Sequence, residues 1–522
     1  MDLQAQAPNP RFAKLPFHSN PDILDEICEY LAYEDEVDAA DIASSRRTLL
    51  RLALTCRAFL GPALDRLWRN LDSLFPLLKV LPAFIQTDGT YVLRGAISRE
   101  EWTRFDWYAL KVRKFSYTRD PDSLDIAMHV YFRLAQLRSA PILPSLRHLH
   151  CPSTNQNDFL ISGICLFLSP SLQTLELGGI TAVEDKLCGT ILYTLFSDGA
   201  QMEKINLRGK GLSRETLHMA TQFEHLRELE LQGMGKTLDM EVLVQIGRLP
   251  WLVDLAIDFT NSPIPHLNED IGLRYLTSLM ITAPISFIFA FLPHIATTTM
   301  ETFFAIAPTT DANKTVFLQD VVARWRDTLR RIALVHQPGQ QEVTVDELTL
   351  AALAPLLPLK KLTYLRLEGY AMELSDMNIE NFALAWPNMD TLLLPFISAG
   401  HARPTVTSLF TLARRLPGLR HLRIPLDTGD LPAFVSTGMP HTPTHALHTL
   451  TIASADDSWE LRDLLHLARR IDYFFPRLRY VHPYEAHDVD RWLQVHEMIQ
   501  MYQAVRKEAV AFERARLTGA LW

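Results

Sequence analysis

Several short stretches of the sequence contain residue types that could do chemistry. The stretch "QGMGKT", from Gln232 to Thr237, ends like a phosphate-binding loop, in which a glycine-rich turn cradles phosphates and a lysine reaches their charge. That motif needs a glycine five residues before Gly235, where the sequence has Glu230. A glycine-rich turn after a strand explains the stretch equally well, so no nucleotide site is predicted.

Three histidines are the candidates for a metal site. The stretch "HTPTHALH" places His441, His445 and His448 close together along the chain. Pro443 prevents the helix that would aim the first two imidazoles at one ion, and no carboxylate or cysteine stands beside them. A surface turn is the expected structure, and no metal site is predicted.

The five cysteines are spaced without any CxxC pair. This spacing favours a reduced, intracellular chain over a disulfide framework. Cys151, Cys165 and Cys188 fall within or beside apolar segments, so they are expected to be small core residues. Because the sequence offers no nucleophile–base pair and no H-E-x-x-H motif, it predicts a protein that is not an enzyme and needs no cofactor.

The length and charge of the chain limit the kinds of fold and partner that can form a binding site. Its 522 residues exceed one ordinary globular core, which predicts several domains or an array of repeats. The net charge of −9 gives no support to nucleic acid or an anionic membrane as the main partner. The apolar stretch "PISFIFAFLP" is too short to span a membrane, and the first twenty residues lack the apolar region of a secretory signal. A cytoplasmic location, a nuclear location or both are expected.

One short pattern recurs through most of the chain: an apolar residue, two others, an apolar residue, one other, and an apolar residue, as in "LQTLEL" and "LRELEL". From Leu146 to Leu478 its occurrences are on average about 28 residues apart. The fourteen occurrences begin at Val112, Leu146, Leu172, Met202, Leu226, Leu252, Leu276, Met300, Leu329, Leu362, Met389, Leu419, Leu447 and Leu478.

The last part of each pattern alternates apolar and polar residues, as a short strand with one buried face does. The intervening residues supply a turn and a helix. The period and the pattern resemble those of leucine-rich repeats, with glycine often replacing the asparagine or cysteine that usually follows the strand. The expected fold class is α/β, a solenoid of parallel strands and helices in a horseshoe. Chance matches in a leucine-rich chain are the alternative.

The residues before the repeats predict three helices. Asn20 is expected to cap the first, with Pro21 at its first position and Asp22 in its first turn. The acidic stretch 34–41 is expected to be a solvated loop, and Gly61–Pro62 to separate the second helix from the third. The apolar stripes expected on the three helices are Ile23, Leu24, Ile27, Tyr30 and Leu31, then Leu49, Leu52, Cys56 and Phe59, then Leu64, Leu67, Trp68 and Leu71.

These helices resemble an F-box. The opening LPxEILxxIxxxL of that family appears as "NPDILDEICEYL", its middle LxxLxxVCxxW as "LLRLALTCRAF", and its final LW pair as Leu67 and Trp68. The resemblance implies a subunit that binds a Skp-family adaptor, and through it a cullin and a RING protein, while the repeats hold a protein substrate for ubiquitin transfer. The adaptor contacts implied by the resemblance are Pro21, Ile23, Leu24, Ile27, Leu52, Leu54, Cys56, Phe59, Leu67 and Trp68.

Two other interpretations stay open for the N-terminal helices. Their apolar residues could dock on the first repeats, and different faces could serve both purposes. The whole chain could also be a leucine-rich scaffold that acts outside ubiquitination. The predicted organisation is a disordered tail at 1–14, an F-box-like module at 15–80, a connecting segment at 81–109, the repeat solenoid at 110–485 and a helical cap at 486–522, which could instead be a partner-binding helix.

Residues between the buried positions of each pattern are expected to point to the concave face of the solenoid. This face mixes both signs of charge, and it does not name the protein substrate that it would bind. The predicted substrate-binding residues are Lys204, Arg208, Glu228, Glu230, Asp254, Tyr364, Arg366, His421 and Arg423.

Overall fold

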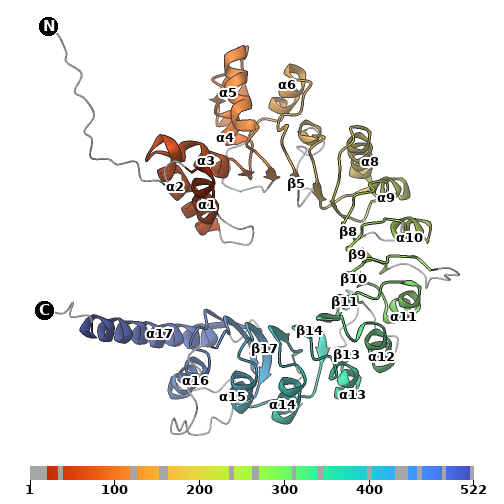
Figure 1. The fold of residues 1–522 in the computed structure, drawn as a ribbon, viewed down its shortest axis with the longest axis vertical. Helices are drawn as coiled ribbons and strands as arrows, with labels where there is room; N and C mark the ends of the chain where they lie inside the picture. The colour runs from red at the N-terminus through yellow and green to blue at the C-terminus, as the bar shows by residue number, and fades with distance from the viewer. Residues whose placement is uncertain are drawn as a thin grey trace. The chain divides into compact units, whose positions relative to one another are not determined.

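Figure 1 shows the fold of the chain as a computed structural model. It describes residues 20–32, 39–117, 126–151, 163–233, 240–260, 270–308, 313–337, 346–396, 403–428, 445–454, 461–484 and 489–517. The predicted tail at 1–14, most of the "QGMGKT" stretch and His441 lie outside these residues. The chain divides into two compact units, Met1–Gly233 and Met234–Trp522, which are described separately.

The first unit begins with three helices and continues as alternating strands and helices. Its helices are α1 (Pro21–Leu31), α2 (Ala39–Ala53), α3 (Arg57–Leu67), α4 (Phe75–Leu78), α5 (Arg99–Ala109), α6 (His129–Leu137), the 3-10 helix Ile164–Phe167, α8 (Ala182–Ser197) and α9 (Arg214–Ala220). Its strands are β1 (Asn70–Leu71), β2 (Phe84–Thr87), β3 (Thr90–Leu93), β4 (Lys114–Ser116), β5 (His148–Cys151), β6 (Thr174–Leu177), β7 (Lys204–Arg208) and β8 (Glu228–Gln232).

The second unit repeats the same alternation. Its helices are α10 (Met240–Gly247), α11 (Ile285–Phe291), the 3-10 helix Leu292–His294, α12 (Lys314–Trp325), α13 (Leu350–Leu353), the 3-10 helix Ala354–Leu356, α14 (Asp376–Ala385), α15 (Val406–Arg415), α16 (Leu461–Phe474) and α17 (Val489–Leu517). Its strands are β9 (Asp254–Asp258), β10 (Ser278–Thr282), β11 (Thr302–Ala307), β12 (Arg331–His336), β13 (Asp346–Glu347), β14 (Tyr364–Glu368), β15 (Tyr370–Ala371), β16 (Thr391–Leu393), β17 (His421–Leu426), β18 (Thr449–Ser454) and β19 (Tyr480–Pro483).

Fifteen of the described strands pair in parallel with neighbouring strands of the repeated pattern. Six of them belong to the first unit and nine to the second. All fourteen strands that the repeated pattern predicts are present, and each begins two residues after the first apolar residue of its pattern. The fifteenth, β1, was not predicted; it pairs in parallel with β4, Asn70 opposite Lys114. The chain is therefore an α/β protein built from repeated strand–helix units.

Stacked apolar rows explain why the units repeat. Leu149, Leu175, Ile205 and Leu229 lie opposite one another in successive strands, and each is almost completely buried. In the first unit α8 and α9 lie on one side of these strands (Figure 1), so the other side of each strand keeps its polar residues in contact with solvent. A short strand buries its apolar face only against its neighbours and their helices, as in other repeat proteins.

A glycine follows several of the strands for a steric reason. Gly369, directly after β14, has a φ of +77°, and a Cβ at this position would lie 1.8 Å from the carbonyl oxygen of His336. Only glycine accepts both the left-handed conformation and this close approach of the preceding repeat. The stacking of one repeat on the preceding one thus explains why a glycine stands here in place of asparagine or cysteine.

The N-terminal module, α1–α3, has a small core of its own. Asn20 caps α1 through the amide of Asp22, and Pro21 occupies the first turn, as predicted. The buried residues of this core are Leu24, Cys28, Leu49, Ala53, Phe59 and Ala63, with Ile27, Leu31, Leu52, Ala58 and Leu67 packed against them. In α1 the buried side chain near the C-terminus is Cys28, whereas Tyr30, predicted on the apolar stripe, is 90% exposed.

Three predicted boundaries in this module were wrong. The second and third helices separate at Leu54–Cys56, and Gly61 and Pro62 lie inside α3. Because Phe59 and Ala63, on the two sides of Pro62, are both buried in the module core, packing holds the helix together across the proline. Leu71, predicted on the third helix, is in β1. The last residues of the acidic stretch predicted as a loop, Ala39–Asp41, form the start of α2.

Of the three cysteines predicted to be core residues, Cys151 and Cys188 are buried, and burial raises the pKa of each thiol to about 12. Cys165 is exposed, contrary to the prediction. It lies on the 3-10 helix Ile164–Phe167, whose other three side chains are buried, so the turn directs Cys165 outward.

The helix α17 ends the second unit. Trp492, Val495 and Ile499 on this helix are fully buried, and Gln503 donates a hydrogen bond to the carbonyl of Leu478 at 2.8 Å. Its N-terminal half therefore covers α16 and β19 with apolar side chains, in the place where a terminal repeat would otherwise expose its core.

Candidate functional site

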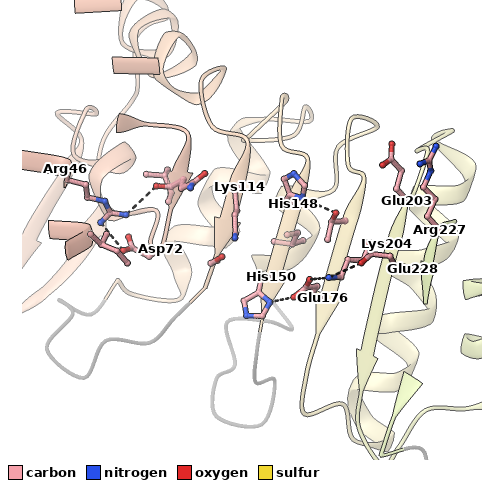
Figure 2. A pocket seen from close by; sticks show the side chains of 16 residues that line it. Arg46, Asp72, Lys114, His148, His150, Glu176, Glu203, Lys204, Arg227 and Glu228 are labelled. Carbon is pink, nitrogen blue, oxygen red and sulfur yellow. Dashed lines mark hydrogen bonds and ion pairs between the residues drawn. The ribbon is translucent and has the colours of Figure 1, made fainter. Parts of the chain in front are cut away.

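The polar face of the first unit's strands holds a cavity of about 710 Å³. Figure 2 shows side chains from successive strands turned toward it. The lining residues are Ile42, Arg46, Asn70, Leu71, Asp72, Lys114, Ser116, His148, Leu149, His150, Thr174, Glu176, Glu203, Lys204, Arg227 and Glu228. Most of them come from the positions between the buried residues of the pattern, which the parallel register places side by side.

A ladder of charges crosses this cavity through Glu176 (Figure 2). Nδ1 of His150 lies 2.7 Å from one carboxylate oxygen of Glu176, and Nζ of Lys204 lies 3.2 Å from the other. Lys204 also contacts Glu228 at 3.3 Å. Four successive strands, β5 to β8, are thus linked through the side chains of His150, Glu176, Lys204 and Glu228.

A second ladder lies one step further along β7 and β8. Arg208 donates to Glu230 at 2.7 Å, and Asn206 donates to the other oxygen of the same carboxylate at 2.5 Å. Four of the predicted substrate-binding residues, Lys204, Arg208, Glu228 and Glu230, are therefore engaged with their neighbours on one surface. A ligand that binds here must exchange these contacts for its own.

The pKa of Glu176 falls to about 2. The hydrogen bond with His150 is the largest cause of this lowering; partial burial opposes it, and the charge of Lys204 and its hydrogen bond lower the pKa further. Since the carboxyl binds its proton more weakly in the folded chain than in the unfolded chain, the ladder stabilises the fold above the ordinary glutamate pKa. That contribution is lost as the pH falls toward 2.

We expect Glu176→Gln to lower the stability of the first unit by about 1–2 kcal/mol at pH 7, a modest value because the ladder is partly exposed to solvent. The difference from wild type should shrink at pH 3, where the wild-type carboxylate begins to take up its proton. Thermal unfolding at the two pH values measures this. Glu224→Gln, an exposed carboxylate of the same unit, is the control and should show no such convergence; an equal and pH-independent loss in both variants would contradict the role of the ladder.

Arg46 reaches the strand face from the N-terminal module. Its guanidinium lies 3.0 Å from Asp72 and also donates to the carbonyl of Asn70 at 3.5 Å. The first helices and the first strand of the sheet thus share one wall of the cavity. Nothing in the sequence around Arg46 indicated this contact, because it joins residues 26 positions apart.

In the second unit the predicted residues fall into smaller groups. Arg366 and Arg423 both contact Glu368, at 2.5 Å and 3.4 Å. Burial alone would raise the pKa of Glu368, but the hydrogen bond from Arg366 and the charge of Arg423 together lower it. Tyr364 lies under the guanidinium of Arg331, 4.9 Å from ring to guanidinium carbon. Asp254 on β9 and His421 on β17 are not part of this group.

The residues implied as adaptor contacts do not all face solvent. Leu24 and Phe59 are buried in the module core, and the side chain of Trp68 packs on Tyr108 of α5, with ring centroids 4.6 Å apart. Four are exposed: Pro21, Ile23, Leu54 and Cys56. The remaining three, Ile27, Leu52 and Leu67, are half-buried against the module core.

Residues of the strand face that were not predicted occupy the same positions of the repeated pattern as those that were predicted. His148, His150 and Glu176 stand between the buried residues of "LRHLHC" and "LQTLEL", the two patterns that precede Lys204. The pattern would have found them if it had been applied to every repeat. Lys114 on β4 follows the same rule.

The described residues offer neither a metal cluster nor a membrane span. They contain no group of three or more histidine, cysteine, aspartate or glutamate side chains placed to hold a metal ion. No helix within these ranges has the length and apolar character needed to cross a bilayer. Comparison with models of protein families gives no match for this chain, and no curated protein sequence matches it.

Proposed function

We propose that this chain is a substrate receptor of a Skp–cullin–F-box ubiquitin ligase and has no catalytic activity of its own. In this proposal α1–α3 are an F-box that binds a Skp-family adaptor, and the strand–helix units are leucine-rich repeats whose polar strand face binds a protein substrate. The observation that carries it is the set of large apolar side chains that α1–α3 leave exposed.

These side chains are unusually numerous for so small a module. Ile23 and Tyr30, seven residues apart on one face of α1, are 39% and 90% exposed, and Leu54, just after α2, is 76% exposed. Leu50 and Leu60 are also exposed. A soluble monomer rarely leaves such a group uncovered, and interface cores are built from residues of this kind.

The burial of Leu24 and Phe59 narrows the proposed adaptor surface. Those two side chains hold the helices together, so they support adaptor binding only indirectly. Ile23 and Leu54 are the residues of the F-box-like pattern that are both large and exposed. They are therefore the positions at which a substitution can test binding without damaging the module core.

The strand face has the character of a surface that binds protein. It is polar, carries both signs of charge in paired arrangements, and has an opening of about 710 Å³ in the first unit. A partner with a complementary series of charges could exchange with the ladders at little cost, because each partly exposed pair contributes little by itself.

Leu54→Asp and Ile23→Asp are expected to weaken capture of the Skp-family adaptor by at least about 10-fold, because each places a charge in an apolar interface core. The measurement is affinity capture of the full-length chain from cells, with quantitation of co-purified adaptor and cullin. Val183→Asp is the matched control: Val183 is 73% exposed, on α8 of the same unit, and outside α1–α3.

Recovery of adaptor and cullin with the wild type and the control, and their loss from both module variants, supports the proposal. Recovery of the adaptor without cullin would make the chain a binding scaffold outside ubiquitination. If the wild type captures no adaptor, or if both module variants retain it fully, the F-box assignment is wrong.

A further inference from the structure

A second cavity, of about 840 Å³, lies at the beginning of the first strands of the first unit. One part of its lining comes from α1, from α3 and the turn after it, and from the end of α5 and the turn after it. The other part comes from residues that precede or begin β1, β4 and β5. The lining residues are Asp25, Glu29, Ala32, Asp65, Arg66, Arg69, Asn70, Trp107, Leu110, Lys111, Arg113, Lys114, Arg147 and His148.

Three arginines form a row along this cavity. Arg69, Arg113 and Arg147 each stand directly before a strand, and the strands are in register, with Asn70 opposite Lys114 and Lys114 opposite His148. Neighbouring strands are about 5 Å apart, so the backbones of the three arginines are at that spacing. The repeat that stacks the apolar rows thus also stacks three positive charges.

More cationic than anionic side chains line this cavity. Six lysine and arginine side chains line it, against three carboxylates. Glu29 is paired with Arg66 at 2.8 Å and with Arg69 at 3.1 Å, and Asp65 is paired with Lys111. Those pairs lie on the side of the cavity formed by α1 and α3 and do not include Arg113 or Arg147.

Arg113 and Arg147 retain most of their hydrogen-bonding capacity. Arg113 donates to the carbonyl of Ser145 at 3.1 Å, and neither arginine has an ion pair with a carboxylate among the residues that the structure describes. A guanidinium offers five donors in a planar fork. Two such forks at strand spacing match the several oxygens and the double negative charge of a phosphate group.

The geometry points to a phosphate-monoester site at Arg113 and Arg147. The cavity is much larger than a phosphate group, so it accommodates the group that the phosphate is attached to. It shares Asn70, Lys114 and His148 with the cavity on the strand face, so that attached group can continue across the strands.

Titration of the full-length chain with inorganic phosphate at constant ionic strength tests the site, with binding followed by calorimetry. Arg147→Gln is the first variant, because Arg147 is exposed and its loss should not disturb folding. We expect at least a 10-fold weaker affinity for Arg147→Gln, no measurable binding for Arg113→Gln combined with Arg147→Gln, and an intermediate affinity for Arg147→Lys, which keeps the charge without the fork.

Arg227→Gln is the matched control. Arg227 stands at the same position of its repeat, directly before β8, and lines the other cavity, so the variant changes net charge equally and leaves this site intact. Its affinity for phosphate should equal that of the wild type. Equal weakening by Arg227→Gln and Arg147→Gln would show nonspecific attraction, and no saturable phosphate binding to a folded wild type would also overturn the proposal.

Two further probes distinguish the source of the phosphate. A short phosphoserine peptide that binds more tightly than inorganic phosphate and than its unphosphorylated form indicates a phosphorylated protein segment. Tighter binding of glucose 6-phosphate than of inorganic phosphate instead indicates a small phosphorylated metabolite. Either increase in affinity must be lost in Arg147→Gln. If the increase persists in this variant, the probe binds elsewhere and the assignment to this cavity is wrong.

Discussion

Replacing Trp325 with alanine is expected to lower the free energy of unfolding of the second unit by about 3–5 kcal/mol. The indole is 2% exposed, its Nε1 donates to the carbonyl of Thr297 at 2.9 Å, and its ring lies 5.7 Å from that of Phe303 on β11. The substitution removes the largest type of core side chain and leaves a buried carbonyl without its donor. Denaturant unfolding, followed by circular dichroism, measures the loss.

Trp251→Ala is the control for the loss of an indole as such. Trp251 is 57% exposed and stacks on Tyr275, 6.4 Å away, so its replacement should change stability by no more than about 1 kcal/mol. Trp325→Phe should fall between the two, because it keeps most of the packing and loses the hydrogen bond. Equal effects of Trp251→Ala and Trp325→Ala would mean that the repeats do not depend on this buried contact.

The fourteen predicted strands could be placed from the sequence because their signal is local and repeated. Each buried row requires an apolar residue at the same offset in every repeat, as at Leu175, Ile205 and Leu229. A one-residue error would turn a whole strand over, so the sequence pattern and the register agree closely. The helices between the strands vary more in length, because only their apolar face is constrained.

The strand β1 was missed because a serine, Ser73, stands at the third apolar position of its pattern. Asn70 is opposite Lys114, so Trp68 stands where Val112 stands in the next repeat. The stretch "WRNLDS" satisfies the first two apolar positions and has a serine at the third. In the resemblance to an F-box, Trp68 belongs to the final LW pair, whereas in the structure it stands at the start of the first repeat.

The two cavities differ in how much of them a sequence can reveal. The strand face follows from alternation along each strand, so His150, Glu176 and Lys204 could be assigned to it without a structure. The row Arg69, Arg113 and Arg147 is visible only when the repeats are aligned, and the carboxylates of α1 and α3 that face it come from outside the repeats. Contacts of this range depend on how helices pack, which no local pattern specifies.

Leu24→Asp is expected to unfold the N-terminal module, with a loss of at least about 4 kcal/mol. Leu24 is 4% exposed and belongs to a small core to which the described residues contribute six buried side chains, including Cys28, Leu49 and Phe59. The variant removes a leucine from this core and places a carboxylate in it. Hydrogen exchange of α1–α3 measures the effect, while exchange in the second unit should be unchanged, since repeat structures depend mainly on contacts between neighbours.

Leu54→Asp is the matched variant for this experiment. It introduces the same carboxylate into the same module at a side chain that is 76% exposed, so the amides of α1–α3 should keep their protection. Both variants are expected to lose adaptor capture, Leu24→Asp because the module is unfolded and Leu54→Asp because its surface is changed. If Leu54→Asp also removed the protection of α1–α3, loss of capture could not be assigned to a contact surface; if Leu24→Asp left that protection intact, the six-residue core would not be what holds the module together.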